Sequence, residues 1–139
     1  MAEQPLSWLT SPDAAQVIAA AGQTGVDPNA IERLRRTFPQ FTSEQVGTAI
    51  HQSWLRTRAA QRWGTPTNFL LTTDGLEQAT CPVVSQWHSE IITSLAGANA
   101  RVVDLTCGLG FDAAAIARAG HQVTAIERDP DIEIGRAHV

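Results

Sequence analysis

Two carboxylates and two glycines between residues 104 and 127 have the types and spacing of a ligand site. Gly108 and Gly110 remove side chains where a backbone must turn tightly or approach a ligand. Glu127 ends the following apolar segment, where a carboxylate can accept hydrogen bonds from both hydroxyls of a ribose. Asp104 would repel a pyrophosphate but attract a cationic ligand. S-adenosylmethionine, with its sulfonium and ammonium groups, fits this combination.

The segments around these residues are expected to form a strand, a glycine turn, a short helix and a second strand. Residues 101–105 are apolar on both sides of their alternation except at Asp104, which is typical of a strand buried in a parallel sheet. Residues 111–120 predict a helix, and residues 122–127 predict a parallel strand reached by a right-handed crossover. A ligand of such a sheet lies across the carboxyl ends of its strands, against the glycine turn.

Residues 11 to 64 predict a small all-helical region. Ser11 precedes Pro12 and Asp27 precedes Pro28, as at helix starts, and Thr42 to Gln45 form a capping-box sequence. Gly64 should end the last of these helices. The residues expected to face the core are Ile31, Leu34, Phe38, Val46, Ile50 and Trp54.

Residues 65–98 read as a linker followed by a lead-in helix. Phe69 to Leu71 could form one strand, and Asp74-Gly75 predicts a turn. A helix is expected from about Pro82 to Gly97, because four apolar residues recur there on one face: Val84, Trp87, Ile91 and Leu95.

Composition excludes several classes of protein. Apolar residues make up 43% of the 139 residues, but no apolar run approaches the roughly 20 residues of a membrane span. The first residues do not have the basic start and apolar core of a secretory signal, and the two cysteines and four histidines have no metal-ligand spacing. We therefore expect a cytoplasmic protein without a metal site.

The net charge of -4 argues against a generally basic surface, but residues 28 to 64 carry six arginines against two acids. This Arg33 to Arg62 basic region is a weak candidate for contacting RNA. A solvated helix face is the more common explanation of such a cluster.

The stretch VVDLTCGLGFD resembles motif I of class I S-adenosylmethionine-dependent methyltransferases, with the acid of the second strand in the expected place. It is most similar to putative RNA methyltransferases called THUMP-like, in which a helical region and a segment like LEQAT (Leu76 to Thr80) also precede motif I. The resemblance covers most of residues 10 to 131. It implies a Rossmann-like fold, S-adenosylmethionine as cofactor, RNA as substrate, and cofactor-binding residues at Asp104, Thr106, Gly108, Gly110, Asp112 and Glu127.

The resemblance also predicts an organisation for the chain. Residues 1–64 would be the helical region, 65–98 the linker and lead-in helix, and 99–132 the first half of the methyltransferase domain. Residues 133–139 read like a translated sequencing adapter and would be a non-native tail. On this interpretation the sheet is truncated, the chain is an inactive N-terminal fragment, and no residue is assigned as catalytic.

Three alternatives stay open from the residues themselves. GLGFDA also satisfies the G-x-G-x-x-A pattern of NAD(P)-dependent oxidoreductases. The helical region could instead be a non-enzymatic RNA-binding module. Asp112 could cap its helix rather than touch a ligand.

Overall fold

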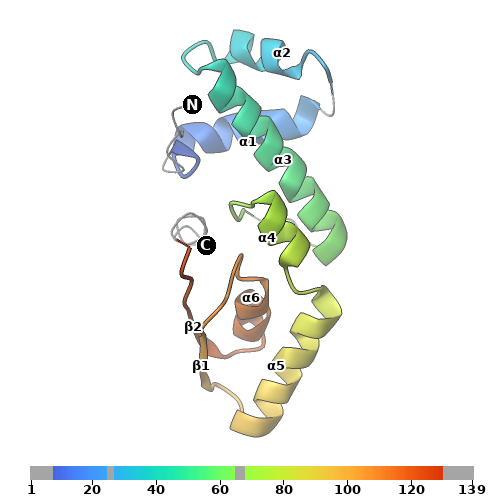
Figure 1. Ribbon diagram of the computed structural model, residues 1–139, viewed down its shortest axis with the longest axis vertical. Coiled ribbons are helices and arrows are strands. Elements are labelled where there is room, and N and C mark those ends of the chain that lie inside the picture. Colours follow the sequence, from blue (N-terminus) through green and yellow to red (C-terminus); the bar gives the residue numbers. More distant parts are fainter. Residues whose placement is uncertain (1–7, 25–26, 65–67, 130–139) are drawn as a thin grey trace.

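The computed structural model describes residues 8–24, 27–64 and 68–129, which form six helices and a two-stranded parallel sheet. The fold is therefore of the mixed α/β type. Figure 1 shows an elongated molecule, with α1 to α3 at one end and α5, α6 and the sheet at the other. In chain order the elements are α1 (Pro12–Thr24), α2 (Ala30–Thr37), α3 (Ser43–Trp63), α4 (Thr73–Gln78), α5 (Pro82–Ala96), β1 (Arg101–Asp104), α6 (Phe111–Arg118) and β2 (Gln122–Ala125).

The helix ends of the helical region follow the sequence signals. The Ser11 hydroxyl accepts the N–H of Ala14 at 3.1 Å, and Thr42 forms a reciprocal capping box with Gln45. Gly64 ends α3 in the left-handed conformation, with φ of 72°. The expected start of α2 at Pro28 is wrong by two residues, because α2 begins at Ala30.

The first hydrophobic core joins α1, α2 and α3. Val17, Leu34 and Val46 lie at its centre, each 3% exposed or less. Trp54, which the sequence placed on the buried face of α3, is 42% exposed and stacks on His51 instead. The apolar stripe of α3 thus leaves this core before the helix ends.

The second hydrophobic core joins the later part of α3 to α4 and to the glycine turn. Leu55, Leu71 and Leu109 are buried together there. Buried Gln52 fixes the approach of the linker, because its side-chain amide donates to the carbonyl of Leu71 and accepts the N–H of the same residue. The helical region and the glycine turn therefore share one core.

Helix α4 replaces the turn expected at Asp74-Gly75, and no strand forms at Phe69 to Leu71. The Thr72 hydroxyl accepts the N–H of Gly75 at 3.0 Å and so caps a helix at the point where the glycine predicted a turn. Leu76, in the middle of this helix, is 4% exposed and anchors it in the second core.

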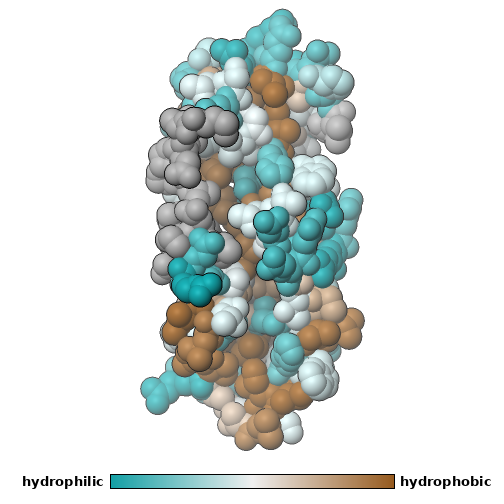
Figure 2. Space-filling model, in the orientation of Figure 1, coloured by the Kyte–Doolittle hydropathy of each residue, from teal (hydrophilic) through white to brown (hydrophobic). Residues whose placement is uncertain are grey.

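The sheet pairs β1 with β2 in parallel, from Arg101 opposite Gln122 to Asp104 opposite Ala125. Figure 1 shows α5 and α6 on the same side of the strands. The expectation that β1 is buried on both faces is wrong: Val103 is 57% exposed and Leu105 is 68% exposed. Within the described ranges no helix covers that face of the sheet, and Figure 2 shows hydrophobic residues gathered at this end of the molecule.

The buried face of α5 also differs from the prediction. Ser85 and Ser89 are the buried residues of α5, whereas Trp87 is 56% exposed and Leu95 is 83% exposed. Small serines let α5 lie close against α6, so the apolar stripe turns outward. His121 supports this end, because its ring bonds the Thr93 hydroxyl at 2.8 Å and accepts the N–H of Ala100 at 3.2 Å.

Candidate functional site

A cavity of about 490 Å³ lies where the carboxyl ends of the strands meet the glycine turn. Its volume is within the range of small-molecule sites. Its wall also includes the end of α4 and the segment that leads into α5. All six residues that the sequence singled out line this cavity: Asp104, Thr106, Gly108, Gly110, Asp112 and Glu127.

The glycine turn depends on backbone conformations that glycine adopts most easily. Gly108 has φ of 52° and Gly110 has φ of 82°, both in the left-handed region. Gly110 is also the N-cap residue of α6, and its N–H bonds the carbonyl of Cys107 at 2.8 Å. The turn therefore directs the N-terminal end of α6 at the cavity wall, where its N–H groups favour hydrogen-bond acceptors.

Glu127 holds the turn against the end of the second strand. One carboxylate oxygen accepts the N–H of Gly108 at 2.8 Å. The other accepts the N–H groups of Arg128 at 2.8 Å and Asp129 at 3.0 Å. These bonds orient the carboxylate at the cavity, and a ribose hydroxyl there would share its oxygens with the backbone.

Asp104 is the last residue of β1 and lines the same cavity. Its carboxylate accepts the N–H of Thr106 at 3.1 Å, and its carbonyl accepts the N–H of Ile126 at 2.8 Å. Both strand ends thus present an acid to the same cavity.

Asp112 belongs to a polar cluster rather than to a helix cap. The Thr80 hydroxyl donates to its carboxylate at 2.7 Å, and His88 Nδ1 lies 3.4 Å from the same oxygen. Burial alone would raise the pKa of Asp112, but the Ser85 and Thr80 hydroxyls and the His88 imidazole outweigh it and hold the pKa below its ordinary value. The N-cap of α6 is Gly110, so the capping interpretation of Asp112 is wrong.

The charges around the cavity are unbalanced. Among the described residues, Asp104, Asp112, Glu127 and Asp129 line it, against a single cation, Arg128. Such a wall favours a ligand that carries positive charge and hydroxyl groups, and it disfavours an anionic pyrophosphate.

Several residues of the site escaped the sequence reasoning. Gly75 lines the cavity and touches the turn, since a Cβ there would lie 2.9 Å from Leu109 Cγ. Its only signal in the sequence is the glycine itself, which predicts a turn. Thr80 fell within the LEQAT resemblance without an assigned role, and nothing in the sequence pairs His88 with Asp112.

The described residues contain no group of three or more histidines, cysteines or acids that could hold a metal ion. Within the same ranges, no helix combines the length and apolar character required to cross a membrane.

The arginines of the basic region mostly serve the fold. Arg56 donates to the carbonyls of Asn68 and Phe69, and Arg62 donates to those of Leu76 and Ala79. Three others pair locally: Arg33 with Asp27, Arg36 with Glu32, and Arg58 with the Trp54 ring. The structure thus gives no support to RNA as a partner of this region.

The chain matches no family model, no curated protein and no solved structure.

Proposed function

We propose that the strand-end cavity binds S-adenosylmethionine and that the protein is a class I methyltransferase with a Rossmann-like domain. The observation that carries the proposal is the convergence of Asp104, Asp112 and Glu127 on one cavity beside the glycine turn.

The residues present fit each part of this cofactor. The Asp104 carboxylate would attract the cationic methionine end. Glu127, already oriented by three backbone N–H groups, would accept the ribose hydroxyls. Gly108 would let the adenosine part approach the backbone, because no side chain stands there.

The cofactor, when bound, supplies a methyl group for attack by a nucleophile. What the described residues do is hold and orient the cofactor, which contributes to rate through positioning. None of them is assigned a proton-transfer role. RNA as the methyl acceptor follows from the motif resemblance, and the basic region adds no support to it.

A nicotinamide-dependent oxidoreductase remains the second candidate, because GLGFDA fits its glycine pattern. The four acids and one arginine among the described lining residues would place a pyrophosphate in a repulsive field. The structure therefore favours the cationic cofactor.

Calorimetric titration of the protein with S-adenosylmethionine, S-adenosylhomocysteine and NADH tests the proposal. We expect saturable binding of both adenosyl ligands and none of NADH. Binding of NADH alone, or of no ligand, would refute it.

A further inference from the structure

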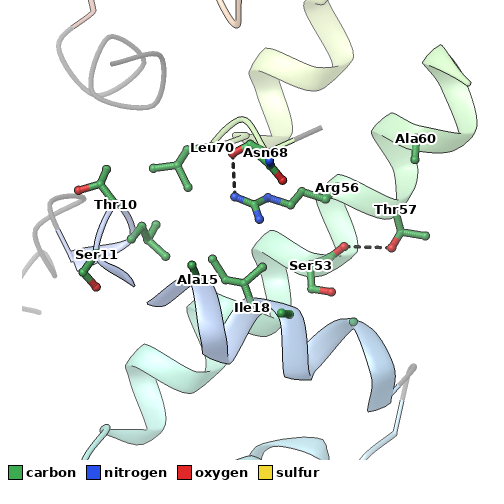
Figure 3. Close-up of a pocket in the computed structure, with 13 residues that line it drawn as sticks. Thr10, Ser11, Ala15, Ile18, Ser53, Arg56, Thr57, Ala60, Asn68 and Leu70 are labelled. Atoms are coloured by element: carbon green, nitrogen blue, oxygen red, sulfur yellow. Dashed lines mark hydrogen bonds between the residues drawn. The ribbon is translucent and has the colours of Figure 1, made fainter. Parts of the chain in front are cut away.

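A second cavity, of about 620 Å³, lies between α1, α3 and residues 68–70. Its lining shares no residue with the strand-end cavity. Figure 3 shows the Arg56 side chain reaching from α3 across this pocket toward Asn68, with Ala15 and Ile18 of α1 on the other side. Arg56 is the one charged residue among the described residues that line it.

The guanidinium of Arg56 is only partly used. Its Nε donates to the carbonyl of Phe69 at 3.2 Å, and its Nη2 donates to the carbonyl of Asn68 at 2.9 Å. A guanidinium has five N–H donors, so three remain after these two bonds. No carboxylate of the described residues forms an ion pair with Arg56.

Arg56 is partly buried, and the partial desolvation of its cation is a cost that an anion would relieve. Partial burial lowers the pKa of Arg56, because desolvation disfavours the charged form. The carbonyl oxygens of Asn68 and Phe69 offset part of this cost, and a full negative charge would offset more of it. Among the described residues that line it, the pocket therefore has one positive charge and no negative charge.

The rest of the lining limits the kind of anion. Leu9, Ile18 and Leu70 give the pocket an apolar wall, while Ser53 and Thr57 add hydroxyl groups from α3. A polyanion would need several cations along its path, and this pocket offers one. A planar carboxylate matches the remaining guanidinium edge in a two-pronged hydrogen bond.

We propose that the pocket between α1 and α3 binds a small organic carboxylate, with its carboxylate group on Arg56 and its apolar body against Ile18 and Leu70. This site is independent of the strand-end cavity and of the methyltransferase proposal.

Nuclear magnetic resonance of the ¹⁵N-labelled protein with hexanoate tests the site, because the Arg56 Nε–H group gives its own signal. We expect hexanoate to shift this signal and the amide signals of Ser53 and Thr57 in a saturable way. Hexanamide, which has the same shape without the charge, should have little effect. Equal shifts with both compounds, or shifts spread over all arginines, would overturn the proposal.

Two variants separate loss of the site from loss of the fold. Arg56→Gln should weaken hexanoate binding by roughly 10-fold to 150-fold, the value of a charge-assisted bond. Ala15→Phe fills the pocket from α1, where Ala15 is exposed, and should block binding while Arg56 and its carbonyl bonds stay in place. Arg58→Gln, on the same helix but outside the pocket, is the control and should bind normally. Undiminished binding by Ala15→Phe would place the ligand elsewhere and refute the proposal.

Discussion

Trp63, the last residue of α3, stacks face to face on Phe111, the first residue of α6, with ring centroids 4.0 Å apart and an interplanar angle of 16°. Phe111 directly follows Gly110, so the stack joins the helical region to the glycine turn. The Phe69 ring, from the linker, also packs against Phe111, with ring centroids 5.5 Å apart. The helical region therefore supports the candidate site through packing.

Replacing Trp63 should weaken both the fold and the site. Trp63→Leu removes the ring stack and part of the second core, and we expect the free energy of unfolding to fall by about 2 kcal/mol. S-adenosylhomocysteine binding should also weaken, because the glycine turn loses its support. Trp54→Leu, on the exposed part of the same helix, is the control. If urea unfolding showed the same loss of unfolding free energy in both variants, the stack would have no special role.

Gly75 provides a second test of how the turn is held. Gly75→Ala should destabilise the protein although alanine favours helices, because the new Cβ would lie 2.7 Å from Thr72 Oγ1 and 2.9 Å from Leu109 Cγ. Gly47→Ala in α3 meets nothing within 4 Å and should stabilise by about 0.5–1 kcal/mol. The midpoints of thermal unfolding should shift in opposite directions in the two variants. A higher midpoint for Gly75→Ala than for the wild type would contradict the close contact.

The sequence predicted the local features that short-range chemistry determines. The capping box at Thr42, the end of α3 at Gly64 and the β1-α6-β2 order are confirmed. The six candidate residues were chosen from one motif and a following acid, and the structure brings them to one cavity. Whether they bind the cofactor remains a prediction.

The sequence failed where tertiary contacts decide. Gly75 looked like a turn, but the Thr72 cap and the burial of Leu76 select a helix. Helix α5 was expected to bury Trp87, yet its small serines face α6. The ends of the chain, residues 1–7 and 130–139, lie outside the described residues, and so does the predicted non-native tail at 133–139.

The carboxyl group of Asp112 should make the free energy of unfolding fall as the pH is lowered into the acid range. Its folded pKa lies below the ordinary aspartate value of about 4, so it stabilises the fold above that value and loses this contribution as the pH falls through the folded pKa. Asp112→Asn should therefore lose less free energy of unfolding than the wild type as the pH falls from 7 to 3. Asp74→Asn, at an exposed position of α4, should behave like the wild type in urea unfolding at both pH values. An Asp112→Asn variant as acid-sensitive as the wild type would contradict this role.

The two strand-end acids should act on different parts of the cofactor. Glu127→Ala should weaken the binding of S-adenosylmethionine and of adenosine alike, by roughly 10-fold to 150-fold, because both ligands carry the ribose. Asp104→Asn should weaken the binding of S-adenosylmethionine more than that of adenosine, because adenosine has no positive charge. Glu77→Ala, exposed on α4 and outside the cavity, is the control for calorimetry. Equal losses of both ligands in Asp104→Asn would contradict the assignment.

The most direct test of the central claim is to map where S-adenosylhomocysteine binds on the ¹⁵N-labelled protein. We expect the amide signals of Thr106, Gly108 and Gly110 to shift together with those of residues 127–129, and NADH to leave them unchanged. Shifts elsewhere in the protein, with the glycine-turn signals unmoved at saturation, would contradict the claim that the strand-end cavity is the cofactor site.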